Sequence, residues 1–251
     1  MNLGNPIATG NTANLYLLDS KIMKVFKDFL PQGEAYYEAK KQQYAYSKGL
    51  NAPKVLEVKN INDSQAIVME YIYGETLGQQ LLNDLEHAER YMKLLINVQT
   101  SIHAVIVEAD ALEPLPERLK SKLQAVSCLN DIQKQALLLK LKSLKHEHRL
   151  CHGDLHPFNL IATDKEVYII DWVDASAGDR QADICRTYLL FLSFSIELAE
   201  LYIDMYCKHT TILKGEILEW LPIIAGARLY ENVSAEENKL LMKMVNEYCS
   251  R

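Results

Sequence analysis

The sequence predicts an α+β protein, with a small antiparallel sheet near its amino-terminal end and a mostly helical remainder. In the first 72 residues, short β-branched and apolar segments alternate with turn residues, which indicates antiparallel strands. From Thr76 onward, amphipathic segments with helical periodicity dominate. One hairpin pattern, between Asn159 and Asp171, interrupts this helical part. A chain of this length can form one large domain or two lobes.

The composition is that of a globular protein. The chain has 251 residues, of which 49% are hydrophobic and 24% are charged, and its formal net charge is −6. The acidic balance and the lack of a basic stripe argue against nucleic-acid binding. The five widely spaced cysteines favour reduced thiols over a disulfide framework or a zinc site.

The chain shows no pattern for export or membrane insertion. Its first ten residues lack the apolar core of a signal peptide. No apolar run approaches the ~20 residues that a helix needs to cross a bilayer. We expect a cytoplasmic protein without membrane contact, and the sequence leaves its oligomeric state open.

Residues 7–18 have the pattern of a strand, a turn and a second strand. The turn lies at Gly10 and Asn11. The backbone N–H groups of such a turn, together with the Thr9 and Thr12 hydroxyls, can cover phosphate oxygens. An ordinary surface hairpin explains the same residues, so this segment alone does not decide between the two.

The next predicted strand, residues 21–27, contains a lysine in an unusual place. Side chains alternate along a strand, so Ile22, Lys24 and Phe26 share one face. A lysine between two apolar neighbours is unusual for a buried strand. We expect its ammonium group to point into a cleft, toward phosphate oxygens.

A helix over residues 33–48 is expected to supply the partner of this lysine. The segment is rich in helix formers and is followed by Gly49, a common helix end. Glu38 is the better partner for Lys24, because Glu34 lies in the first turn and there favours the helix N-terminus. Solvated surface glutamates are the alternative.

The hairpin after Asn159 brings oxygen-bearing side chains together. Two apolar runs, residues 160–162 and 167–170, flank four polar turn residues. Asn159 and Asp171 therefore meet at one end of the hairpin, the end at which Asp154 also lies. A carboxamide and a carboxylate can hold Mg²⁺, and a further carboxylate can orient an attacking hydroxyl and accept its proton.

A transition-metal site is a rival interpretation of the same loop. His152, Asp154 and His156 alternate, so on a regular strand all three would face one way. Gly153 and Pro157 interrupt strand character, however, and a metal site leaves the ends of the hairpin unexplained. A purely structural turn is the third possibility.

The segment from His152 to Asn159 reads His-Gly-Asp-Leu-His-Pro-Phe-Asn, and Ile-Ile-Asp-Trp follows around Asp171. This arrangement resembles the aminoglycoside phosphotransferase and choline kinase-like family, which consists of small-molecule kinases. The resemblance covers most of the chain, with its specific residues between positions 151 and 183. It implies a two-lobed protein-kinase-like fold. ATP and Mg²⁺ would bind between a five-stranded amino-terminal lobe, residues 1–72, and a helical carboxy-terminal lobe, residues 73–251.

The resemblance also implies which residues hold the nucleotide. Lys24, supported by Glu38, would contact the α- and β-phosphates. In the segment between the lobes, the Glu70 carbonyl and the Ile72 N–H would contact the adenine edge. The residues expected to bind the nucleotide are Lys24, Glu38, Gly10, Asn11, Thr12, Ile22, Glu70 and Ile72.

The roles in the transfer step follow from the same resemblance. Asp154 would orient the acceptor hydroxyl, and Asn159 and Asp171 would bind Mg²⁺. His156 occupies the place where protein kinases have a lysine, so it would donate to the transferring phosphoryl group. The acceptor is expected to be a small molecule such as an aminoglycoside, choline, ethanolamine or a sugar.

Three other functions compete with a small-molecule kinase. An inactive nucleotide-binding pseudokinase scaffold is the main alternative, although every polar position of the motif is filled. A protein kinase would need room for an activation segment, and only eleven residues separate Asp171 from Asp183. A metal-dependent hydrolase is the third. Outside the motif, His103 is expected to be a packed residue, and Asp183 is expected to be a helix N-cap.

Overall fold

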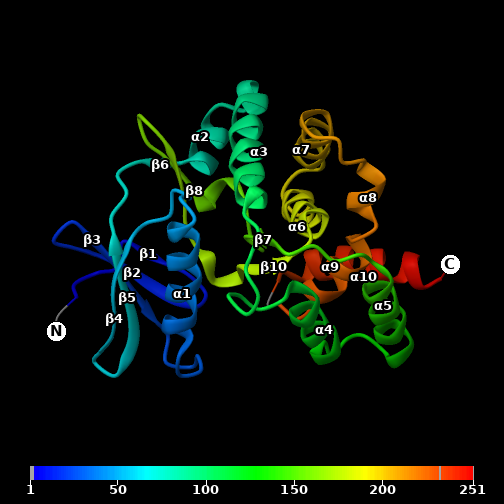
Figure 1. Cartoon of the computed structure of the whole chain (residues 1–251), viewed down its shortest axis with the longest axis horizontal. Helices are drawn as coiled ribbons and strands as arrows, with labels where there is room; N and C mark the ends of the chain where they lie inside the picture. Colours follow the sequence, from blue (N-terminus) through cyan, green and yellow to red (C-terminus); the bar gives the residue numbers. More distant parts are fainter. Residues whose placement is uncertain (1–2, 232, 251) are drawn as a thin grey trace. The chain divides into compact units, whose positions relative to one another are not determined.

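The predicted antiparallel sheet is present in the computed structural model, which describes residues 3–231 and 233–250. Figure 1 shows its five strands together, in blue to cyan. Each strand is antiparallel to its neighbours, and the order in the sheet is β1-β2-β3-β5-β4. The strands are β1 (Ala8–Thr9), β2 (Ala13–Leu18), β3 (Lys21–Phe26), β4 (Val55–Ile61) and β5 (Ser64–Glu70).

The two faces of this sheet bury different side chains, as strand alternation requires. Met23 belongs to an apolar cluster on one face, together with Val68. Phe26 belongs to the cluster on the other face, where it packs with Ala39 of helix α1 (Glu34–Ser47). Lys24 therefore shares the face of the sheet that helix α1 covers, as its position in the strand predicts.

The predicted hairpin after Asn159 also forms, and it adds to a small second sheet. Strands β8 (Leu160–Ala162) and β9 (Val167–Ile169) pair antiparallel, and β6 (Glu75–Thr76) pairs with β8. Three short helices accompany this sheet. They are α2 (Leu77–Asn83), η2 (Pro157–Asn159) and η3 (Trp172–Asp174).

A glycine allows helix α2 to approach the residues before the hairpin. A Cβ atom at Gly78 would lie only 2.5 Å from the ring of Phe158. Real Cβ atoms do not come this close to other atoms, so only glycine lets the Phe158 ring lie flat on the helix backbone. This contact holds η2, whose last residue is Asn159.

The chain forms two compact units. One contains the residues up to Asn83 together with Pro157–Asp174, and the other contains Asp84–His156 together with the residues from Ala175 onward. The hairpin that follows Asn159 thus belongs to the unit with the five-stranded sheet. The predicted division into residues 1–72 and 73–251 stays a prediction, because it concerns functional lobes rather than internal packing.

The second unit is mostly helical, as predicted. Helix α6 packs against α7, α8 and α9, and its residues from Ala182 to Leu189 are buried. Among the residues that the structure describes, no helix has both the length and the apolar character needed to cross a bilayer. The elements are η1 (Leu85–His87), α3 (Ala88–Ala104), α4 (Leu115–Ala125), α5 (Asp131–Ser143), β7 (Arg149–Cys151), β10 (Ser176–Gly178), α6 (Arg180–Leu192), α7 (Ile196–His209), α8 (Lys214–Leu218), α9 (Leu221–Arg228) and α10 (Ala235–Cys249).

Helix α6 begins differently from the prediction. Its N-cap is Asp179, whose carboxylate accepts a hydrogen bond from the Gln181 N–H at 2.9 Å. Asp183, the expected N-cap, lies one turn inside the helix, so that prediction was wrong. Burial raises the pKa of Asp179 to about 6; Glu147 adds to this rise, and the Gln181 amide opposes it.

Asp179→Asn is expected to stabilise the protein at pH 7, by about 1–2 kcal/mol. Asparagine can still cap the helix, and it removes a carboxylate whose pKa is higher in the folded state than in the unfolded state. Between the ordinary pKa of 3.8 and the folded value of about 6, only the folded state holds this proton. Wild-type stability therefore falls as the pH rises through this window, and the advantage of the variant should shrink at pH 5. Urea unfolding at both pH values checks this.

The control for this prediction is Asp131→Asn, in the first turn of α5, where the side chain is exposed. Its effect on the free energy of unfolding should be small at both pH values. If the two asparagine variants show the same change between pH 5 and pH 7, Asp179 does not hold a proton in the folded state.

Candidate active site

Lys24 lies between two carboxylates in the first unit. Its Nζ atom is 2.7 Å from Glu38 Oε1 and 3.0 Å from Asp171 Oδ1. The expected contact with Glu38 is therefore present, and Asp171 provides a second one. The ammonium group also lies 5.6 Å from the centre of the Phe26 ring, a favourable cation–π distance.

The surroundings keep the Lys24 side chain charged. Burial alone would lower the pKa of Lys24, but Glu38 and Asp171 outweigh it, and the net pKa is raised. Lys24 and Glu38 are almost fully buried, whereas the Asp171 side chain is 40% exposed. One cation thus serves two carboxylates, and the more exposed carboxylate remains able to bind a further cation.

The hairpin brings Asn159 and Asp171 to the same end, as predicted. Leu160 pairs with Ile169 in the β8–β9 register, and the Ile170 N–H donates to the Asn159 carbonyl at 3.0 Å. Asp171 follows directly after Ile170. Asn159 is buried, so its carboxamide is held at this end of the hairpin rather than free in solvent.

Two hydrogen bonds fix the backbone around Asp171. The Trp172 indole donates to the Ile169 carbonyl at 3.0 Å, and Lys41 of helix α1 donates to the Val173 carbonyl at 2.6 Å. Asp171 itself has a φ of 63°, in the left-handed region that aspartate tolerates better than most residues. Helix α1 therefore orients this loop as well as supplying Glu38.

The other predicted nucleotide-binding residues lie on strands of the same unit or next to them. Gly10, Asn11 and Thr12 form an exposed turn between β1 and β2, in which the Gly10 N–H donates to the Ala13 carbonyl at 2.9 Å. Their contacts with a nucleotide remain predictions. The same holds for three residues at other positions, which are Ile22 in β3, Glu70 at the end of β5 and Ile72 just after it.

In the second unit, Asp154 lies beside an arginine and a histidine. Its Oδ1 atom is 3.0 Å from Arg186 Nη2, and its Oδ2 atom is 3.6 Å from His156 Nε2. Burial would raise the pKa of Asp154, but His156 and Arg186 overcome this and hold the pKa well below its usual range. Asp154 is therefore ionised at neutral pH.

Asp183 anchors the loop that contains Asp154. Its carboxylate accepts from the Gly153 N–H at 2.7 Å, from the His152 N–H at 3.3 Å and from His103 Nε2 at 2.8 Å. Gly153 has a φ of 83°, which glycine adopts without strain. Burial would raise the pKa of Asp183, but these partners keep it lowered. His103 is a packed residue, as expected.

Arg186 and the anchoring role of Asp183 were missing from the sequence prediction. Both residues lie on helix α6, about thirty positions after the loop that they contact. A pair of charged residues on one face of a strongly apolar helix was the available signal. Their partners are far away in the sequence, so only the folded chain identifies the contacts.

Metal binding is not explained by protein side chains alone. Among the described residues, no three His, Cys, Asp or Glu side chains are grouped closely enough to hold a metal ion. Mg²⁺ in phosphoryl-transfer enzymes typically combines one or two carboxylates with oxygens of the substrate phosphates. Asn159 and Asp171 fit that type of site, in which the nucleotide supplies the remaining ligands.

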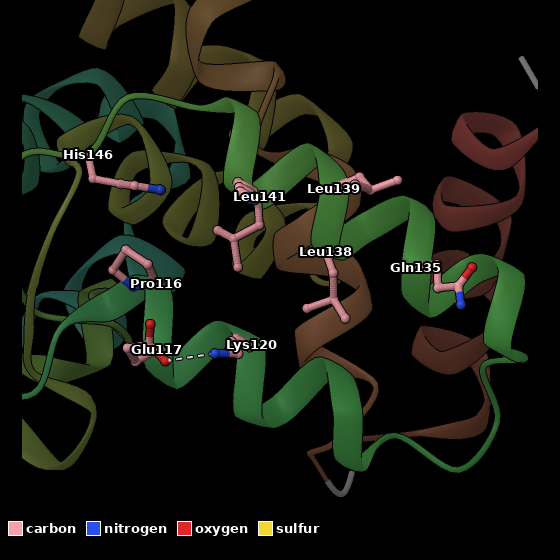
Figure 2. Close-up of a pocket in the computed structure, with 9 residues that line it drawn as sticks. Pro116, Glu117, Lys120, Gln135, Leu138, Leu139, Leu141 and His146 are labelled. Atoms are coloured by element: carbon pink, nitrogen blue, oxygen red, sulfur yellow. Dashed lines mark hydrogen bonds and ion pairs between the residues drawn. The ribbon is translucent and has the colours of Figure 1, made fainter.

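A groove in the second unit contains none of the predicted site residues. It lies between helices α4 and α5 and has a volume of about 730 Å³. Figure 2 shows Leu138 and Leu141 on one side and Pro116 on the other, with Lys120 of α4 paired to Glu117 at 3.3 Å. This apolar hollow is separate from the Asp154 loop.

Asp183→Ala is expected to destabilise the protein strongly, by about 3–5 kcal/mol. The substitution leaves the buried His152 N–H, the partly buried Gly153 N–H and the buried His103 ring without their acceptor. Chemical unfolding measures the change. The matched control is Asp204→Ala, on exposed helix surface, where the carboxylate pairs with Lys214 at 3.3 Å and its loss should cost less than about 1 kcal/mol. Equal effects would show that Asp183 is not an anchor.

Comparison with known proteins gives the family. The model of the phosphotransferase enzyme family matches residues 4–220. Relatives include the protein LicA homolog of Mycoplasma capricolum subsp. capricolum, 29% identical over 155 residues, and protein LicA of Haemophilus influenzae, 27% identical over 184 residues. These matches cover 59% and 69% of this chain, but only 60% and 66% of the relatives, so the similarity spans less than two thirds of their length.

Solved structures agree on the fold. Aminoglycoside phosphotransferase APH(4)-Ia superposes with a TM-score of 0.71 at 14% identity, over 98% of this chain and 90% of that one. Choline kinase LicA from Streptococcus pneumoniae superposes with a TM-score of 0.67 at 18% identity, over 98% and 92%. The predicted protein-kinase-like fold is therefore confirmed. Since the family model spans most of the sequence, this chain belongs to the phosphotransferase enzyme family.

Proposed function

We propose that this protein is an ATP-dependent kinase that transfers the γ-phosphate to a hydroxyl group of a small molecule. The observation that supports this most directly is the position of Lys24 between Glu38 and Asp171. A strand lysine, a helix glutamate and an aspartate after a hairpin are the parts that kinases use to hold phosphates and metal. Variants of aminoglycoside phosphotransferase APH(4)-Ia, which has this fold, have been crystallised with ADP or AMP-PNP together with hygromycin B.

In this proposal, Lys24 binds phosphate oxygens of the nucleotide. Its two carboxylate partners keep the ammonium charged and aligned before the nucleotide enters. Asn159 and Asp171 would hold Mg²⁺ through their side-chain oxygens. The metal would neutralise charge on the phosphates and orient the γ-phosphate for in-line attack.

Asp154 is the proposed partner of the acceptor hydroxyl. An ionised carboxylate can accept the hydrogen bond of that hydroxyl and so direct its oxygen at the γ-phosphorus. As the new O–P bond forms, the bond between the γ-phosphorus and the bridging oxygen breaks. ADP leaves, and the hydroxyl proton passes to Asp154. His156, which lies 3.6 Å from the same carboxylate, would donate to an oxygen of the transferring group.

The chain itself limits the separation of the two groups of residues. Asp154 and Asn159 are five positions apart, so their Cα atoms can be at most about 18 Å from each other. Asp154 belongs to the helical unit, and Asn159 belongs to the unit with the sheet. One short segment therefore joins Asp154, which is proposed to contact the acceptor hydroxyl, to Asn159, the first of the proposed metal ligands.

The acceptor is best sought among amino alcohols, aminoglycosides and sugars. Choline heads this panel, because a protein with the same fold is a choline kinase and the sequence relatives include LicA proteins. The proposed use of ATP also favours a cytoplasmic location. A screen of ATP consumption with choline, ethanolamine, hygromycin B and a panel of sugars tests the proposal. A folded protein that binds MgATP but consumes none with any acceptor would favour the pseudokinase alternative.

Lys24→Ala is expected to weaken nucleotide binding much more than Lys21→Ala. Lys24 is buried between two carboxylates, whereas Lys21 is an exposed residue of the same strand. We expect the dissociation constant of MgATP to rise about 10-fold or more for the first variant and less than about 2-fold for the second. Isothermal calorimetry measures both. Equal effects would mean that Lys24 does not contact the nucleotide.

Asp154→Asn is expected to bind MgATP normally and to lose turnover by about two orders of magnitude. The amide keeps the size of the side chain but cannot accept the hydroxyl proton. Steady-state kinetics with an acceptor from the screen, combined with calorimetry, separates the two effects. Asp164→Asn, in the exposed hairpin turn, is the matched control and should leave turnover unchanged. Turnover of Asp154→Asn within about 3-fold of wild type would remove Asp154 from the transfer step.

A further inference from the structure

The guanidinium of Arg186 contacts both the side chain and the backbone of the loop that carries Asp154. Its Nη2 atom donates to Asp154 Oδ1 at 3.0 Å, and its Nε atom donates to the Gly153 carbonyl at 3.2 Å. The Arg186 side chain is only 9% exposed. Two separate donors of one rigid group therefore set both the position of the backbone and the orientation of the carboxylate.

Arg186 is in turn held by Glu231. The Nη2 atom that contacts Asp154 also donates to Glu231 Oε2 at 2.9 Å. Two further cations pair with Glu231, which are Arg228 of helix α9 at 2.8 Å and Lys122 of helix α4 at 3.0 Å. Through Arg186, Glu231 thus connects Asp154 to helices α4 and α9 of the same unit.

We propose that Arg186 and Glu231 are positioning residues, which hold the Asp154 carboxylate in the orientation that accepts a hydrogen bond from the acceptor hydroxyl. This inference rests on the proposed kinase function. In-line transfer requires reacting atoms to be placed within a fraction of an ångström. Asp183 holds the backbone of the loop, and Arg186 adds a restraint on the Asp154 carboxylate itself.

The geometry requires an arginine rather than any cation. The planar guanidinium presents Nε and Nη2 in a fixed fork, so it can reach the Gly153 carbonyl and Asp154 at the same time. A lysine at this position would keep the charge between Asp154 and Glu231. It would offer a single nitrogen on a flexible stem and could not restrain both partners.

The surroundings of Asp154 also give the inference a signature in pH. Burial raises the pKa of Asp154, and Arg186 is one of the groups that lower it. Without Arg186, this pKa therefore rises. Histidines of the same loop still face it, and Asp183 holds the loop backbone. The titratable and charged groups around this carboxylate are His152, His156, Arg186, Asp183 and, through Arg186, Glu231.

The test compares Arg186→Gln and Arg186→Lys with wild type in ATP turnover. The acceptor is choline, or water in slow ATP hydrolysis if choline is not used. We expect kcat to fall about 10- to 100-fold in both variants, with the KM for ATP changed less than about 3-fold. In Arg186→Gln, the ¹³C-detected titration of the Asp154 carboxyl should move to higher pH than in wild type.

Arg180→Gln is the matched control, because it removes an arginine from the same helix. Arg180 makes a two-point ion pair with Glu147, at 2.8 and 3.0 Å, and does not contact Asp154. Its turnover should stay within about 3-fold of wild type, and its pH profile should be unchanged. Thermal unfolding of all variants shows whether each one folds.

The outcomes separate the inference from the proposed function. Wild-type kcat in Arg186→Lys would mean that charge alone suffices and would overturn the positioning role, even if Arg186→Gln failed to fold. If the pKa of the Asp154 carboxyl is the same in Arg186→Gln as in wild type, the positioning role of Arg186 is also overturned. If folded wild type transfers no phosphate to choline, the rest of the acceptor panel or water, the proposed function fails first; the carboxyl titration still tests the contact between Arg186 and Asp154.

Discussion

A buried charge must be paired, and this constraint organises the first unit of the protein around Lys24. The ammonium group is nearly inaccessible to solvent, so it would lose its proton or destabilise the fold without carboxylates beside it. Glu38 and Asp171 supply that charge from a helix and from the residue after a hairpin. Three elements that are distant in the sequence thereby have fixed relative positions. In the proposed function, the contact that stabilises the unit also aligns this cation for the phosphates of the nucleotide.

In the second unit, the buried charge that must be paired is a carboxylate rather than an ammonium group. Asp183 is a fully buried carboxylate on helix α6, satisfied by two backbone N–H groups and an imidazole. One turn further along the same helix, Arg186 pairs with Asp154 and Glu231. Helix α6 therefore holds the loop backbone through Asp183 and Arg186, and it holds the Asp154 side chain through Arg186. Such interlocked pairs restrict motion, which suits a reaction that depends on positioning rather than on a reactive nucleophile.

The segment from His152 to Asn159 is anchored at both of its ends, each within its own unit. At the first end, Asp183 accepts hydrogen bonds from the loop backbone. At the second end, the Phe158 ring packs on helix α2 at Gly78, where any larger residue would collide with it. The anchors differ in kind, since one is electrostatic and the other is steric. Both act on the short stretch that carries the proposed acceptor residue and the first proposed metal ligand.

The sequence by itself determined the local features. Alternating apolar residues produced the five strands, and polar turn residues produced the β8–β9 hairpin. The lysine within an apolar strand face indicated a cation that points into a cleft. The register of that hairpin brings Asn159 and the residue before Asp171 into hydrogen-bonding contact, and a local pattern is enough to predict this. The partner of Lys24 could also be named, because Glu34 lies in the first turn of the helix and Glu38 does not.

Only the tertiary structure decided which distant groups complete these features. The second carboxylate at Lys24, the anchoring role of Asp183 and the pairing of Arg186 with Asp154 and Glu231 all join residues far apart in the chain. A charged residue on a helix is compatible with solvent exposure, capping or burial, and its sequence neighbours do not distinguish these. Burial makes an unpaired charge costly, so the folded core selects the partners, and that selection depends on how the helices pack.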